Sequence, residues 1–131
     1  MSLNQTLDCV AGLCAAILVF TGISATPRPV RTPQAEPRVV EVVARKFAFE
    51  PSRIEVSEGE TVRLLVRSAD GVHGVGIKKF KVTEEVPRGG TPVMIEFTAT
   101  AVGEFEILCS EYCGKGHQEM AAMLVVRARA R

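Results

Sequence analysis

Apolar and polar residues alternate with a period of two through most of the chain beyond residue 38. Over residues 62–66, Val62, Leu64 and Val66 occupy every second position. This period places successive side chains on opposite faces of a strand. The same spacing recurs over residues 40–42, 54–56, 93–97 and 105–109. The pattern predicts a series of strands with one face buried.

Turn-forming residues separate these runs. Asp70-Gly71 and Gly89-Gly90 supply the flexible or positive-φ positions that chain reversals need, as do Glu58-Gly59 and Val102-Gly103. About eight short strands fit between such turns, and no helical period competes with them. The predicted fold class is all-β, a Greek-key β-sandwich of antiparallel strands with one face of each strand in the core.

An apolar segment precedes the strands. Residues 9–26 contain no charged side chain, and a helix of about 18 residues covers about 27 Å, close to the hydrocarbon thickness of a bilayer. We predict an N-terminal hydrophobic helix within residues 1–26, as a membrane anchor or as a cleaved signal segment that ends near the small residues Ser24 and Ala25. The flanking charges oppose export, since Asp8 precedes the segment and arginines follow it.

The remaining boundaries follow from composition and charge. Residues 27–38 carry four prolines, which favour an extended linker. A single domain is expected over residues 39–127, with a basic tail at residues 128–131. The whole chain has 16 Lys plus Arg and 15 Asp plus Glu, whereas residues 39–126 are mildly acidic. We expect no nucleic-acid partner, because the domain lacks the basic field that holds a phosphate backbone.

The residues with metal-binding chemistry gather between residues 109 and 120. Cys, Cys, His and Met follow one another at intervals of four, four and three, at Cys109, Cys113, His117 and Met120. Gly114 and Gly116 disfavour a helix by about 1 kcal/mol each, so a loop between two strands is predicted. A loop that folds back would bring together thiolate, imidazole and thioether groups, which select copper over hard cations.

Other interpretations of these residues remain open. Cys109 and Cys113 could form a disulfide in an exported domain. With His117 and the distant His73 they could form a tetrahedral zinc site. Met120 could be the first core residue of the last strand, and His73 alone could be a surface residue beside a turn. The joint pattern favours copper, because zinc needs no thioether whereas copper sites commonly take a weak axial Met.

The pattern Cys-Ser-Glu-Tyr-Cys-Gly-x-x-His-x-x-Met, with Asp-Gly-Val-His-Gly upstream, closely resembles a known family. It is similar to the dinuclear copper (CuA) domain of subunit II of haem-copper, or cytochrome c, oxidases. The likeness runs from about residue 40 to residue 126 and includes Phe-Ala-Phe-Glu-Pro. It implies a cupredoxin barrel in which Cys109 and Cys113 bridge two copper ions, and His73 and His117 each ligate one.

The resemblance also implies the weaker ligands and the partners. Met120 and the backbone carbonyl of Glu111 would be weak copper ligands, and the Glu111 side chain could approach a magnesium site at the interface with subunit I. The family takes electrons from cytochrome c or another small donor and passes them to the haem of subunit I. The chain would then not be catalytic alone. Its domain would lie on the extracytoplasmic side, anchored to the membrane or secreted to the periplasm.

The chain departs from the long members of this family at the surface that accepts electrons. It has no Trp, and Lys46-Phe47-Ala48-Phe49 stands where those members carry a Trp-rich stretch. Two modes of docking are therefore expected: acidic residues that attract a basic cytochrome c, or an apolar patch that includes Phe47 or Phe49. The alternative function is a stand-alone electron carrier or copper-binding protein, tethered to the membrane or periplasmic.

Overall fold

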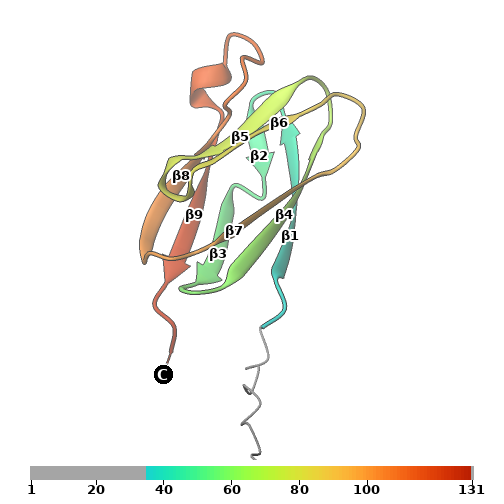
Figure 1. The fold of residues 1–131 in the computed structure, drawn as a ribbon. Coiled ribbons are helices and arrows are strands. Elements are labelled where there is room, and N and C mark those ends of the chain that lie inside the picture. The colour runs from blue at the N-terminus through green and yellow to red at the C-terminus, as the bar shows by residue number, and fades with distance from the viewer. Residues whose placement is uncertain (1–34, 131) are drawn as a thin grey trace, which may run out of the picture. The chain divides into compact units, whose positions relative to one another are not determined.

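Two β-sheets pack face to face in the computed structural model, which describes residues 35–130 (Figure 1). One sheet has the strand order β2-β1-β4-β7, formed by β1 (Arg38–Arg45), β2 (Ala48–Glu50), β4 (Thr61–Ser68) and β7 (Val93–Thr98). The other has the order β3-β9-β8-β5-β6, formed by β3 (Arg53–Ser57), β5 (His73–Ile77), β6 (Val82–Val86), β8 (Gly103–Leu108) and β9 (Ala121–Arg127). The predicted all-β class is confirmed.

The prediction that all strands run antiparallel is wrong for two pairs. β1 pairs with β4 in parallel, and β3 pairs with β9 in parallel. After β1 and β2 the chain crosses to the other sheet as β3 before it returns as β4, so β4 lies beside β1 in the same direction. Parallel neighbours need such a crossover connection, which an alternating pattern within single strands does not reveal.

The predicted alternation decides which side chains form the core. In β4, the exposed fractions of Val62, Leu64 and Val66 are 0%, 1% and 0%. On the other face of the same strand, Arg63 donates to the Glu96 carboxylate on β7. The strands predicted over residues 40–42, 54–56, 93–97 and 105–109 are all present, the last ending at Leu108. The core between the sheets is therefore built as the sequence pattern requires.

Three chain reversals meet at one end of the sandwich. β1 ends at Arg45 beside the turn that carries Lys46 and Phe47, β5 begins at His73, and the loop of residues 109–120 connects β8 to β9. Figure 1 shows this loop, with its short 3-10 helix η2 (His117–Glu119), at the opposite end of the domain from the C-terminal residues. A second 3-10 helix, η1 (Lys78–Phe80), follows β5.

The hydrophobic helix expected within residues 1–26 lies outside the described residues. Between residues 35 and 130, no helix is both long and apolar enough to span a bilayer.

Candidate metal centre

The loop between β8 and β9 is closed at its base by the backbone. Cys109 N–H donates to the Met120 carbonyl at 3.1 Å, so the two ends of the loop lie side by side. Inside the loop, His117 N–H donates to the Gly114 carbonyl at 3.0 Å and begins the turn of η2. This confirms the predicted loop, and it brings residues 109, 113, 117 and 120 to one place.

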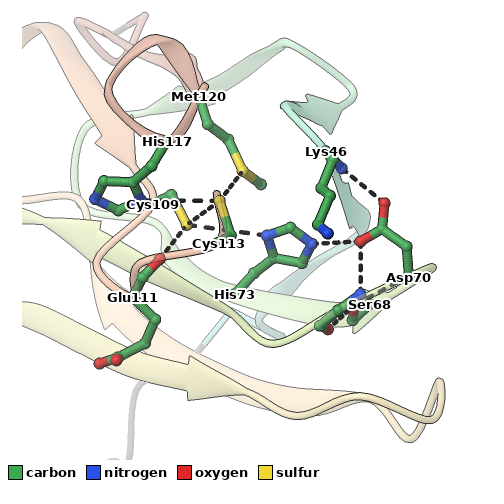
Figure 2. A network of polar contacts seen from close by, with 10 residues as sticks. Lys46, Ser68, Asp70, His73, Cys109, Glu111, Cys113, His117 and Met120 are labelled. Atoms are coloured by element: carbon green, nitrogen blue, oxygen red, sulfur yellow. Dashed lines mark hydrogen bonds and ion pairs between the residues drawn. The ribbon is translucent and has the colours of Figure 1, made fainter. Parts of the chain in front are cut away.

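The two cysteine sulfurs form the centre of the cluster (Figure 2). Cys109 Sγ and Cys113 Sγ lie 3.7 Å apart, and both side chains are buried. Both residues are free thiols, so the disulfide interpretation is not supported by the structure. Two soft donors at this separation can both contact one metal ion or bridge two.

Each cysteine has an imidazole nitrogen beside it. His73 Nδ1 lies 4.0 Å from Cys109 Sγ, and His117 Nδ1 lies 3.8 Å from Cys113 Sγ. His73 comes from β5 and is 0% exposed, which rules out the interpretation of a surface histidine beside a turn. The fold thus brings His73 to the loop from 36 residues away.

Each cysteine also has one weak donor. The Glu111 carbonyl oxygen lies 3.1 Å from Cys109 Sγ, and Met120 Sδ lies 3.7 Å from Cys113 Sγ. Met120 is 0% exposed and belongs to the core, as the interpretation of a core residue expects, but its sulfur points at the thiols. All six residues singled out in the sequence therefore converge here.

Asp70 holds the His73 ring through the nitrogen that does not face the thiols, a role that was not predicted from the sequence. Its Oδ1 lies 2.7 Å from His73 Nε2, and it accepts further hydrogen bonds from the backbone N–H groups of Lys46 at 2.8 Å and Gly71 at 2.6 Å. Partial burial opposes ionisation of Asp70, but these hydrogen bonds together lower its pKa. An ionised carboxylate only accepts, so Nε2 carries the proton and Nδ1 is left free as a ligand.

The thiol of Cys113 is held in its protonated form when no metal is bound. Burial, reinforced by the neighbouring Cys109, raises the pKa of Cys113 to about 11. A metal ion must therefore displace this proton, because the thiolate is the ligand.

The loop is packed against Phe47 from the turn after β1. A Cβ atom added at Gly116 would lie 2.6 Å from Phe47 Cγ, and one added at Gly114 would lie 3.1 Å from Phe47 Cζ. The glycines were predicted only to disfavour a helix. They also leave the space that the Phe47 ring fills, and so help to fix the loop.

The comparisons with known proteins agree with this fold. Residues 12–126 match the family of cupredoxin-like domains. The chain therefore belongs to the cupredoxin-like family. Auracyanin A, a blue copper protein from Chloroflexus aurantiacus, shares the fold with a TM-score of 0.52 and 20% identity over 70% of this chain and 100% of that one.

Within this family the chain is similar to subunit 2 of cytochrome c oxidase. The subunit from Thermus thermophilus is 34% identical over 88 residues, 67% of this chain and 64% of the relative. A haem-copper terminal oxidase dimer has a chain with a TM-score of 0.61 and 25% identity, over 69% of this chain and 65% of that chain. The periplasmic domain of subunit II from Bradyrhizobium japonicum shares the fold with a TM-score of 0.61 and 19% identity, over 70% of this chain and 84% of that domain.

These likenesses confirm the resemblance to subunit II that the loop pattern indicated. The chain spans less than two thirds of the length of the Thermus thermophilus relative.

Proposed function

We propose that this chain transfers electrons through a dinuclear copper centre, as subunit II of a terminal haem-copper oxidase. Cys109 and Cys113 would bridge two copper ions, with His73 and His117 as one imidazole ligand for each. The Glu111 carbonyl and Met120 would be weak ligands. Bound copper would supply one-electron redox chemistry, and the side chains would hold the copper and keep the site rigid.

The observation that carries this proposal is the division of the donors into two sets. Cys109 has His73 and the Glu111 carbonyl beside it, whereas Cys113 has His117 and Met120. Two thiols, two imidazole nitrogens and two weak donors are more than one metal ion needs.

The grouping of the donor atoms favours two ions over one zinc. Donors of a tetrahedral zinc site lie roughly 3.3 to 3.8 Å apart. The donor atoms of His73, Cys109 and Cys113 all lie within 4.8 Å of one another, but His117 is not a member of that group. His117 Nδ1 lies 3.8 Å from Cys113 Sγ without belonging to that group, which supports a second metal position.

The protein keeps this arrangement rigid. His73, Cys109, Cys113 and Met120 are all buried, and Asp70 holds His73 through a hydrogen bond from its outer nitrogen. A site whose ligands are locked by packing changes little between oxidation states, and the surrounding burial and hydrogen bonds tune its potential. These are the requirements of an electron-transfer centre.

The partners and the location follow from the same proposal. The chain would receive electrons from a cytochrome c or another small donor, pass them to the haem of subunit I, and hold its domain on the extracytoplasmic side of a membrane. The Glu111 side chain would be available for magnesium at the interface with subunit I. It packs beside Gly74 of β5, where an added Cβ would lie 3.1 Å from Glu111 Cγ.

Copurification tests the assignment to an oxidase. The chain is expressed with an affinity tag in its native host and purified from solubilised membranes. The eluate is then assayed for haem and for a polytopic partner. We expect haem and the partner to coelute with the chain. A copper-containing chain that elutes without either would instead favour a stand-alone electron carrier.

A further inference from the structure

One stretch of surface beside the thiols combines cations with exposed apolar side chains. A shallow pocket reaches Cys113 from outside and is lined by Lys46, Gly71, Val72, Arg88, Tyr112, Cys113 and Gly114. Two more residues adjoin this pocket: Phe47, whose ring packs on Gly114 and Gly116, and Lys115, which lies between these glycines in the loop. We call this surface the docking face and define it by Lys46, Phe47, Val72, Arg88, Tyr112 and Lys115.

Three exposed apolar or aromatic side chains lie on the docking face. Tyr112 is 77% exposed, Val72 42% and Phe47 38%. The Tyr112 ring lies 5.7 Å from the ring of His117, and the Phe47 ring packs on Gly114 and Gly116. Exposed aromatic side chains therefore contact the same loop that holds the thiols. Phe49 is 1% exposed, so of the two phenylalanines considered in the sequence only Phe47 can belong to an exposed patch.

The charged side chains of the docking face are cations. Lys46, Arg88 and Lys115 are exposed, and none of them takes part in an ion pair within residues 35–130. Their charges are therefore available to a partner.

Some acids of the domain are engaged in ion pairs on the strands, whereas Glu111 and Glu119, on the loop itself, take part in none within residues 35–130. Glu55 pairs with Arg53 and Arg127, and Glu96 pairs with Arg63, on the strands of the two sheets. Asp70 borders the docking face and keeps its negative charge, but its carboxylate faces His73 and the backbone N–H groups of Lys46 and Gly71. The charged side chains that line the pocket itself are Lys46 and Arg88, and no acid lines it.

We propose that the docking face receives a small one-electron carrier protein whose own surface, around its redox group, is acidic. This inference rests on the proposed function, because it concerns the donor for the same copper centre. Charge complementarity steers encounter and sets orientation, while the exposed aromatic rings provide a desolvated contact. In the reaction one electron leaves the donor, for example a haem iron(II) that becomes iron(III), and reduces the oxidised copper centre.

The test uses two donors that differ in charge. One is a basic cytochrome c, and the other is the same cytochrome with its lysines succinylated, which makes it acidic. Stopped-flow absorbance measures the second-order rate at which each reduces the copper-loaded full chain between roughly 10 and 200 mM salt. The variants Arg88→Glu and Lys115→Glu reverse single charges on the docking face. Arg38→Glu, at the start of β1 and so at the opposite end of that strand from Lys46, is the matched control.

We expect the succinylated donor to react with the unaltered chain at a rate that falls as salt rises. Arg88→Glu and Lys115→Glu should each slow that donor roughly threefold to tenfold at low salt and accelerate the basic donor, with the copper spectrum unchanged. Because each donor is compared between variants, its own potential cancels. Arg38→Glu should leave both rates within about twofold.

Opposite or absent charge effects would overturn the inference. If the basic donor is the one that salt slows, or if Arg88→Glu and Lys115→Glu change neither rate, the docking face does not select an acidic partner, while an intact copper spectrum leaves the proposed function standing. If the chain forms no dinuclear copper centre, the proposed function fails instead, and this inference with it.

Discussion

Met120 contributes a weak donor at the edge of the site. Its sulfur lies 3.7 Å from Cys113 Sγ, and the side chain is fully buried in the core. Leu has nearly the same volume, so Met120→Leu should keep the packing and two bound coppers while it removes the thioether. We expect a shifted reduction potential without loss of metal, measured by redox titration and copper analysis.

Met123→Leu, on β9, makes the same substitution away from the thiols and should leave the potential unchanged. Loss of all copper from Met120→Leu, with Met123→Leu unaffected, would show that Met120 is required to hold the metal.

Cys113 makes the stability of the metal-free chain depend on pH. Its pKa is raised from an ordinary value of 9.0 to about 11, chiefly by burial. The stabilising effect of the protonated thiol is fully present below about pH 9 and is lost as the pH rises through 11. Thermal unfolding of the metal-free chain at several pH values should show this decline, and Cys113→Ser should show less of it. Equal declines in both chains would refute this assignment.

The sequence predicted those site residues that lie close to one another along the chain. Cys109, Cys113, His117 and Met120 share one loop, so their intervals alone indicated a site. His73 was found only through the resemblance and through the loop's need for a second nitrogen. Asp70 was treated only as part of a turn, because its hydrogen bond to His73 Nε2 depends on how the turn before β5 folds back.

The loop between β8 and β9 is shaped by its contact with Phe47. Gly116 has a φ of −94°, which any residue can adopt, so the lack of a Cβ there serves only the close approach of the ring. Gly116→Ala should therefore destabilise the chain by about 1 to 3 kcal/mol through overpacking. Denaturant unfolding measures the loss.

A second substitution separates this clash from other effects. In a chain that already carries Phe47→Ala, the further change Gly116→Ala should cost less stability than it costs in the unaltered chain, because the ring that it would clash with is gone. Strict additivity of the two effects would mean that the ring and Gly116 do not interact as the structure indicates.

The sequence predicted which segments form strands better than it predicted how the strands pair. The alternating runs that become β4 and β7 were found because one face of each is buried. β5 was not found, since its sequence His-Gly-Val-Gly-Ile is buried almost throughout and shows no alternation. Pairing was harder still, because the parallel neighbours of β1 and β3 depend on crossings between the sheets.

For the molecule as a whole, the sandwich places the proposed ligands, Asp70 and the docking face at one end, with the paired acids Glu55 and Glu96 on the strands. Overall charge could be counted from the sequence, but the gathering of Lys46, Arg88 and Lys115 at one surface could not, because they come from three separate turns. If the proposed function holds, the distribution of charge over the fold, and not its sum, determines which donor the domain attracts.

The central claim is that the two thiols bridge two copper ions, and copper analysis combined with electron paramagnetic resonance of the copper-loaded full chain tests it most directly. We predict two coppers per chain and a mixed-valence signal from one unpaired electron shared by both metals. Cys109→Ser and Cys113→Ser should each abolish that signal, because one thiolate cannot form the bridge alone. One copper per chain with a mononuclear signal, or preferential retention of zinc when both metals are offered, would contradict the claim.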